Sequence, residues 1–290
     1  MKSGYGLNLD TEIMLLKVIN ELKKKFKSQI DIIPTFLGAH DIPPEYKRKT
    51  NDYVDLIIEK MLPEIKKQDL AEYCDVFCEN GYFDDKQTTK IIKAAKKLKF
   101  KVRIHADEFE DSKGAETAAR LKIHSADHLM SVSDHGIDRL SFKKCVATML
   151  PGTTVFLGKN GFAPVRKMLD RDIRVAIGTD YNPGSCLFNS QPLMMNFAMM
   201  HGKLTLEEAF KGVTRNAALS LGRKNVGIID EGAFADLIFW KLNGIQQIPY
   251  YNTESAQFIT HIVKRGKVFS KLPKVKAPKQ PKKEKEEAKQ

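Results

Sequence analysis

Short apolar runs alternate with helical stripes along most of the chain. Between residues 9 and 26, apolar side chains recur every three or four positions, which predicts an amphipathic helix with Asp10 as its N-cap. An apolar run at 30–36 predicts a strand, and the same alternation then repeats. Further strands are predicted at 74–78, 101–104, 125–129, 145–150 and 173–177, and further helices at 52–65, 84–98, 114–121, 133–140 and 162–169. Such alternation is typical of parallel strands joined by right-handed helical crossovers.

The number of predicted strands indicates a barrel. There are six full strands, and residues 1–5, which end close to a Gly-Tyr-Gly turn, resemble the carboxyl end of another. A (β/α)8 barrel takes about 250 residues, which fits within the 290 residues of this chain. We therefore predict an α/β fold over residues 1–222, a (β/α)8 TIM-type barrel that lacks its first strand, and we expect the chain to be shortened at its N-terminus.

The pattern changes after Leu204. Short helices are predicted at 205–211 and 216–221, and a β-rich segment follows at 223–270. Because that segment is too short to form a stable sheet alone, we predict that it is the C-terminal part of a composite β-sandwich domain whose partner strands come from elsewhere.

Residues 271–290 form a lysine-rich segment. They hold eight of the 48 basic residues and three of the 36 acidic ones, so the rest of the chain carries a net charge of +7 out of the total of +12. Such a polar segment cannot offset the entropy of ordering, and we predict a disordered tail. A localisation signal or a polyanion-binding arm is the alternative to a solvated tail. No aromatic residues interleave with the lysines, which argues against nucleic-acid binding by base stacking.

The apolar segments and the cysteines indicate the cellular compartment of the protein. No apolar stretch approaches the roughly 20 residues of a membrane span, and the first residues lack the apolar core of a secretory signal. Cys74 and Cys78 share one face of a predicted strand, while Cys145 and Cys186 are isolated. We therefore predict reduced, buried cysteines in a cytoplasmic protein without membrane contact.

His105 and Asp180 follow two predicted strands about seventy residues apart. In a (β/α) barrel, residues just past the strand ends point into the active site. Imidazole and carboxylate suit Zn²⁺ or Fe²⁺, and a catalytic site of this kind needs three protein ligands, of which this pattern supplies two. Taken singly, His105 could be a hydrogen-bonded core histidine, and Asp180 a turn residue before Asn-Pro-Gly. Their order within the alternating pattern favours a metallohydrolase.

Seven segments of the chain together resemble one family. They include Ile104-His-Ala-Asp-Glu108 and Gly178-Thr-Asp-Tyr-Asn-Pro-Gly184, and the full set is 2–12, 35–40, 75–79, 104–108, 125–129, 150–152 and 178–184. In this order they resemble imidazolonepropionase, a histidine-degradation member of the amidohydrolase superfamily of metallo-dependent hydrolases.

The resemblance implies a reaction and roles for four residues. The reaction is metal-dependent hydrolysis of the cyclic amide of 4-imidazolone-5-propanoate to N-formimidoyl-L-glutamate. His105 and Asp180 would bind one metal ion, Zn²⁺ or Fe. Glu108, His128 and Asp180 would be catalytic, with His128 donating to the carbonyl oxygen of the substrate, although His128 could also be a core or helix-capping histidine.

The resemblance also implies how the small-molecule substrate is bound, and it allows for a homodimer. The predicted substrate-binding residues are Tyr5, His40, Glu108, Asn182, Gly184 and Ser185. Seen without the family, Tyr5 and His40 would be interpreted as packing residues.

One departure from the family keeps other functions open. The family carries a His-x-His metal pair on its first strand, and none of the seven histidines of this sequence forms such a pair. Two alternatives therefore remain: a related hydrolase that acts on cyclic amides or ring amines, and a catalytically inactive amidohydrolase-like fragment that serves as a binding or scaffold module.

Overall fold

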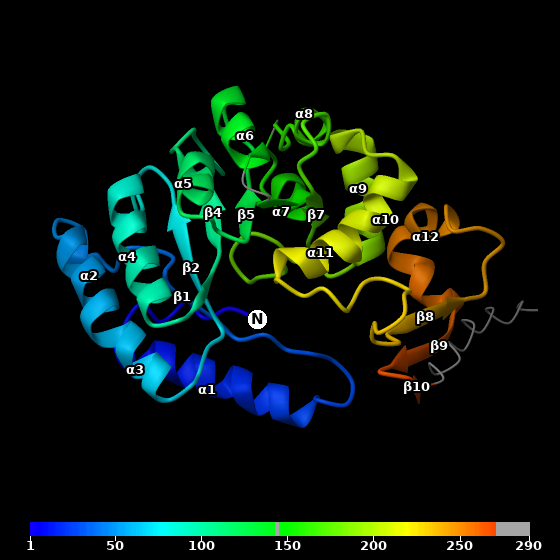
Figure 1. Ribbon diagram of the computed structural model, residues 1–290, viewed down its shortest axis with the longest axis horizontal. Helices are drawn as coiled ribbons and strands as arrows, with labels where there is room; N and C mark the ends of the chain where they lie inside the picture. The colour runs from blue at the N-terminus through cyan, green and yellow to red at the C-terminus, as the bar shows by residue number, and fades with distance from the viewer. Residues whose placement is uncertain (143–144, 160, 271–290) are drawn as a thin grey trace, which may run out of the picture.

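Parallel strands form the centre of the fold in a computed structural model that describes residues 1–142, 145–159 and 161–270 (Figure 1). The strands pair in the order β1-β2-β4-β5-β6-β7, and the short β3 also pairs with β2. Their bounds are β1 Thr35–Ala39, β2 Tyr73–Cys78, β3 Lys101–Val102, β4 Ile104–Ala106, β5 Ser125–His128, β6 Val146–Met149 and β7 Val175–Ile177. The predicted α/β order is confirmed, with parallel pairing throughout this sheet.

Helices surround these strands as an outer layer (Figure 1). Their bounds are α1 Leu9–Lys25, α2 Thr50–Leu56, α3 Leu62–Lys67, α4 Asp85–Lys97, α5 Gly114–Arg120, α6 Asp134–Ser141, α7 Pro151–Phe156, α8 Val165–Leu169, α9 Gln191–Gly202, α10 Leu206–Val213 and α11 Arg215–Ser220. Three short helical turns, η1 Pro44–Tyr46, the π-helical η2 Ile57–Met61 and η3 Asn252–Phe258, complete the described helical set together with α12 Gln247–Tyr251.

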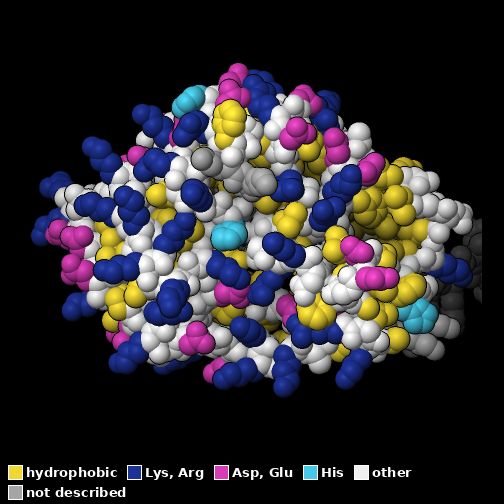
Figure 2. Space-filling view, in the orientation of Figure 1, with side chains coloured by type: hydrophobic (Ala, Val, Ile, Leu, Met, Phe, Trp, Pro, Cys, Tyr) yellow, Lys and Arg dark blue, Asp and Glu magenta, His cyan; other side chains and the backbone are white. Residues whose placement is uncertain are grey.

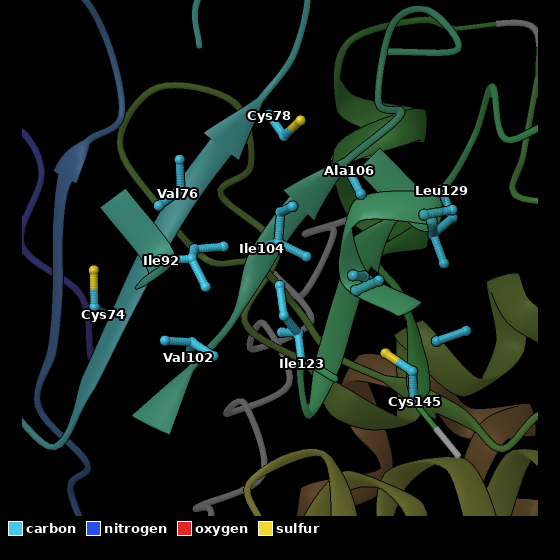
Figure 3. Close-up of a cluster of buried hydrophobic side chains, with 14 of the residues drawn as sticks. Cys74, Val76, Cys78, Ile92, Val102, Ile104, Ala106, Ile123, Leu129 and Cys145 are labelled. Atoms are coloured by element: carbon cyan, nitrogen blue, oxygen red, sulfur yellow. The ribbon is translucent and has the colours of Figure 1, made fainter. Parts of the chain in front are cut away.

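Strand β2 shows how the core and the site share one element. All six of its residues are buried, as expected for a parallel strand covered on both faces. Figure 3 shows Cys74, Val76 and Cys78 in one apolar cluster with Ile92 of α4. Because side chains alternate along a strand, Asp75 points to the opposite face, toward the interior of the barrel. The four cysteines are free and buried, which confirms the prediction.

The structure corrects several predicted boundaries near prolines. The strand expected at 30–36 begins only at Thr35, after Pro34, which has no N–H to donate to a ladder. The helix expected at 52–65 is interrupted by η2 just before Pro63, which cannot donate the usual bond to the preceding turn.

Other corrections concern caps and short elements. The N-cap of α1 is Asn8, whose side chain accepts a hydrogen bond from the N–H of Thr11, and not Asp10. The strand expected at 101–104 is divided into β3 and β4 at Arg103, whose N–H bonds to the carbonyl of Cys74. Helices α7, α9 and α12 were not predicted.

The central sheet has an open seam in the described part of the chain. At one side, Lys2 forms an isolated parallel bridge with Thr35 of β1. At the other side lies β7, and no described residue pairs β7 with the segment at Lys2. A cavity of about 500 Å³ separates the two sides and is lined by residues of both, including Met1 and Ile177. Among the described residues, the parallel sheet therefore stays open between β7 and the segment at Lys2.

A small antiparallel sheet follows the barrel. Its strands β8 Leu237–Trp240, β9 Ile259–Lys264 and β10 Lys267–Ser270 pair in the order β10-β9-β8. The apolar residues 227–229, expected to be β-structured, form no strand. Figure 2 shows hydrophobic side chains gathered over the α9, α10 and α12 region, whereas Lys and Arg are scattered among acidic groups. An apolar cavity of about 910 Å³ lies between α9, α10 and β8.

Two further predictions concern the C-terminal segment and membrane-spanning helices. The lysine-rich segment 271–290 lies outside the described residues. Among the residues that the structure describes, no helix combines the length and apolar character required to traverse a bilayer.

Candidate active site

A polar pocket lies at the carboxyl ends of the parallel strands. Its volume is about 400 Å³. Most of the residues predicted for the site line it, namely Tyr5, His40, His105, Glu108, His128, Asp180, Asn182 and Ser185. Gly184 lines an adjacent cavity together with Tyr5 and Glu108. The structure thus gathers into one place residues that are up to 180 positions apart in the sequence.

His105 is held in a fixed orientation at the end of β4. Its Nδ1 lies 3.0 Å from Oδ1 of Asp75, so the ring donates the Nδ1 proton to that carboxylate. This tautomer leaves the lone pair of Nε2 free, which is the arrangement that metal-binding histidines adopt. The ring centroid of His128 lies 5.2 Å from that of His105. The alternative of a simple core histidine fits less well, because the ring borders a polar pocket.

Asp75 belongs to a buried ionic cluster that the sequence analysis missed. Its Oδ2 lies 2.7 Å from Nζ of Lys2, outside hydrogen-bonding alignment. Arg103 donates from Nη2 to both oxygens of Asp127 at 3.0 Å. Burial alone would raise the pKa of Asp75, but the hydrogen bond from His105 and the positive charges of Lys2 and Arg103 more than reverse this and hold the pKa well below its usual range. The resemblance includes the segment 75–79, but it assigned no role to Asp75.

The ion pair between Asp127 and Arg103 predicts a specific acid sensitivity. Burial favours the neutral carboxyl, yet Arg103 and Lys2 lower the pKa of Asp127 to about 2. Because the pKa is lowered in the folded state, the stabilisation is present above the ordinary value of 3.8 and is lost as the pH falls toward about 2. The stabilisation lost in this way is about 2 kcal/mol of the free energy of unfolding.

Asp127→Asn should therefore remove that part of the acid dependence. Urea denaturation at several values of pH between about 4 and 2 measures it. The free energy of unfolding of the wild type should decrease by about 2 kcal/mol more than that of the variant over this range. Parallel curves for the two proteins would contradict the assignment.

His128 and Glu108 form the second part of the pocket. Nε2 of His128 lies 3.5 Å from a carboxylate oxygen of Glu108, and among the described residues it has no hydrogen-bond partner. Both side chains are buried, and burial is the main cause that raises the pKa of Glu108. His128 also has a positive φ of 76°, a conformation that is strained for a side chain other than glycine and is frequent at functional sites.

Asp180 ends the polar rim after β7. Its φ is 50°, and its Oδ2 accepts a hydrogen bond of 2.8 Å from the hydroxyl of Thr153. The following loop is organised by Asn182, whose Oδ1 accepts the N–H groups of Gly184 and Ser185, both at 2.8 Å. Asp180 thus has a left-handed backbone conformation at the start of the loop, and its side chain lines the pocket.

His40 and Tyr5 lie on the opposite wall. The Nδ1–H of His40 donates to the carbonyl of Gly4 at 2.8 Å, which leaves Nε2 as an acceptor. Burial lowers the pKa of His40, so the ring is neutral near pH 7. The hydroxyl of Tyr5 donates to Oδ1 of Asn182 at 3.3 Å, which connects the two walls across the pocket.

Glu79 has a structural role that the sequence did not indicate. Its Oε2 accepts the N–H of Phe109 at 2.8 Å, and its Oε1 accepts the N–H of Asn80 at 2.9 Å and the hydroxyl of Ser112. These bonds fix the loop that carries Glu108. With its oxygens engaged in these hydrogen bonds, Glu79 positions the loop.

The family model for the amidohydrolase family matches residues 79–269 of this chain. The chain belongs to the amidohydrolase family. Its sequence is 46% identical to the imidazolonepropionase of Caldanaerobacter subterraneus subsp. tengcongensis over 252 residues, which cover 87% of this chain and 60% of that protein. It is 43% identical to the imidazolonepropionase of Clostridium tetani over 271 residues, covering 93% and 64%. The predicted resemblance is confirmed, and the chain spans less than two thirds of the length of these relatives.

Solved structures of amidohydrolase type share the fold. The 5-methylcytosine deaminase from Klebsiella pneumoniae aligns with a TM-score of 0.71 at 15% identity, covering 91% of this chain and 68% of that one. A zinc-bound adenosine deaminase from Xanthomonas campestris aligns with a TM-score of 0.57 at 17% identity, covering 75% and 56%. At such identities the likeness establishes the fold alone.

The pocket contains donors that suit a metal ion. His105 offers Nε2 in a fixed tautomer, and Asp180 offers a carboxylate on the same rim. The buried Nε2 of His128, which has no hydrogen-bond partner among the described residues, is a further sign that the pocket is built to receive a ligand. The donor types of His105 and Asp180 therefore fit a metal ion, and these two residues are the candidate ligands.

A different acidic cluster has a structural explanation. Among the described residues, three ligand-type side chains approach one another within 4.8 Å only at Asp107, Asp111 and Glu116. Asp107 accepts the N–H groups of Gly114 and Ala115 at 2.8 and 2.9 Å, which satisfies free N–H groups in the first turn of α5. The carboxylate of Asp107 therefore serves as the hydrogen-bond acceptor for the first turn of α5.

Proposed function

We propose that this chain forms the main part of an imidazolonepropionase-type hydrolase, which opens the cyclic amide of 4-imidazolone-5-propanoate to N-formimidoyl-L-glutamate in histidine degradation. The observation that carries the proposal is the buried pairing of His128 with Glu108 beside the oriented His105 in one polar pocket. The identity of 42–46% to imidazolonepropionases supports the same reaction.

One Zn²⁺ or Fe ion is the proposed cofactor, with His105 and Asp180 among its ligands. When bound, such an ion would lower the pKa of a bound water molecule toward neutrality. The ion would also polarise the substrate carbonyl. The tautomer imposed by Asp75 on His105 presents the unprotonated Nε2 that ligation requires.

Glu108 is proposed to transfer a proton, and His128 is proposed to stabilise the negative charge that develops on the substrate. Hydrolysis adds water to the ring carbonyl carbon, breaks the bond to the neighbouring ring nitrogen, and leaves a proton on that nitrogen. Glu108, whose pKa is raised by burial, suits proton transfer to the departing ring nitrogen. The unpartnered Nε2 of His128 suits donation to the carbonyl oxygen as negative charge develops there.

The remaining pocket residues are proposed to hold the substrate. His40, neutral and with Nε2 free, can accept a ring N–H. Tyr5 and Ser185 offer hydroxyl groups at the pocket wall. Asn182 and Gly184 shape the loop that faces the propanoate, since the Oδ1 of Asn182 fixes the backbone there.

The broader organisation is also a proposal. We divide the chain into a barrel over 1–222 and a part of a composite β domain over 223–270. A cytoplasmic location and a homodimer remain predictions.

A turnover assay tests the proposed function. Purified protein is supplied with Zn²⁺ or Fe²⁺ and 4-imidazolone-5-propanoate, and N-formimidoyl-L-glutamate is measured by mass spectrometry. Turnover that disappears on chelation and returns on addition of metal is the expected result. Absence of turnover, combined with a rise in melting temperature on addition of the substrate, would indicate a binding module instead. Absence of both would refute a role for this pocket in imidazolone chemistry.

A further inference from the structure

Glu12 is a buried carboxylate for which the reaction gives no role. It lies in the first turn of α1 and is 0% exposed. No cation pairs with it among the described residues, although Tyr53, Leu16 and other core side chains pack in the same region. A buried polar group is costly unless it is hydrogen-bonded, so the hydrogen bonds that Glu12 accepts must offset its burial.

Three backbone N–H groups converge on one oxygen of this carboxylate. Oε1 of Glu12 accepts from Gly4 at 3.1 Å, Gly6 at 2.9 Å and Leu7 at 3.2 Å. Successive N–H groups that point inward in this way form an anion-binding nest. The other oxygen, Oε2, has no partner among the described residues. Among the described residues, the carboxylate of Glu12 therefore accepts hydrogen bonds only from the chain segment 4–7.

That segment carries two walls of the pocket. Tyr5 lies between the bonded N–H groups, and its hydroxyl reaches Asn182. The carbonyl of Gly4 accepts the Nδ1–H of His40, which selects the tautomer of that ring. The rings of Tyr5 and His40 also meet edge to face at 5.2 Å.

The segment has little freedom to find another arrangement. Gly4 has a φ of 112°, and a Cβ at this position would lie 2.7 Å from the carbonyl oxygen of Leu37. A Cβ on Gly6 would lie 2.6 Å from Thr11. Such a tight and unusual backbone needs external bonds to persist, and Glu12 supplies three of them.

We infer that Glu12 is a positioning residue that sets the placement of Tyr5 and the tautomer of His40, so that it controls substrate binding from outside the pocket. This inference rests on the proposed function for its kinetic consequence. The geometric part, in which Glu12 orders the segment 4–7, stands without it.

Matched variants separate positioning from simple destabilisation. Glu12→Leu removes the acceptor, Glu12→Gln retains Oε1, and Leu16→Ala removes packing from the same buried face of α1 but leaves the hydrogen bonds from Glu12 to the segment 4–7 in place. In Glu12→Leu we expect KM to rise about tenfold, with a smaller change in kcat. Glu12→Gln should restore KM to within about threefold of the wild type, and Leu16→Ala should lower the melting temperature with KM unchanged.

A double-mutant cycle adds a second kinetic criterion. If Glu12 acts through Tyr5, the KM effect of Tyr5→Phe should largely disappear in the Glu12→Leu background. Additive effects, or equal KM values for Glu12→Leu and Leu16→Ala, would overturn the inference.

Hydrogen exchange followed by NMR gives a readout that does not depend on catalysis. The amides of Gly4, Gly6 and Leu7 should lose protection in Glu12→Leu while the amides of β2 retain theirs, and Leu16→Ala should leave the three amides protected. If protection persists in Glu12→Leu, the positioning role is wrong. A wild type that lacks turnover counts against the proposed function, and the exchange data still decide whether Glu12 orders this segment.

Discussion

Glu108→Gln should lower kcat by about 10²–10⁴-fold while the protein stays folded, because an amide cannot carry the proton that the departing ring nitrogen needs. The side chain is buried beside His128 and makes no hydrogen bond that the substitution would break among the described residues. Steady-state kinetics with 4-imidazolone-5-propanoate measure the effect. Glu110→Gln, on the exposed part of the same loop, is the matched control and should retain wild-type kcat.

The pH profile provides a second signature of Glu108. Burial raises its pKa above the ordinary value of 4.5, so the wild-type profile should contain a limb displaced upward from that value. This limb should be absent in Glu108→Gln and present in Glu110→Gln. A Glu108→Gln variant with kcat near that of the wild type would exclude Glu108 as the proton carrier.

Asp75→Asn should lower the affinity for zinc by about 10–100-fold. The carboxylate of Asp75 accepts the Nδ1–H of His105 and offsets the charge of Lys2. An amide can present its NH₂ group to the ring instead, which permits the wrong tautomer, and it leaves Lys2 and Arg103 with one negative charge fewer. Competition titration with a zinc chelator measures the zinc affinity. Thermal denaturation measures how the loss of the negative charge beside Lys2 and Arg103 changes the melting temperature.

A surface ion pair serves as the control for Asp75→Asn. Asp138 pairs with Arg171 in an exposed position, where such pairs contribute less than about 1 kcal/mol. Asp138→Asn should therefore leave both zinc affinity and melting temperature nearly unchanged. If Asp75→Asn behaved in the same way, His105 would not depend on Asp75 for its orientation.

The repeating elements of the barrel were predictable because burial leaves a strong periodic signal. Strand β2, buried at all six positions, and α4, which has a capping box between Asp84 and Gln87, both lie within one residue of their predicted bounds. The segment 30–36 was misassigned because its apolar residues precede Pro34, and the ladder starts only after that residue. Apolar content alone could not reveal this.

The pocket was predictable only in part. Strand ends identified His105 and Asp180, and the resemblance added Tyr5, His40 and His128. The matching segments contain Asp75, Glu79 and Glu12, but neither source indicated what these residues do, because their roles depend on which groups the tertiary fold brings to their oxygens. A carboxylate in a strand or a helix looks the same in sequence whether it faces solvent or a buried N–H group.

Hydrolysis in water enriched in ¹⁸O tests directly whether water attacks the ring carbonyl of the substrate. Attack of water on the ring carbonyl places one labelled oxygen atom in the α-carboxylate of N-formimidoyl-L-glutamate, and mass spectrometry of product fragments locates it. We expect label at this position in the wild type and a strongly reduced rate of labelling in Glu108→Gln. Release of ammonia from the ring, or label elsewhere in the product, would contradict hydrolysis of the cyclic amide in this pocket.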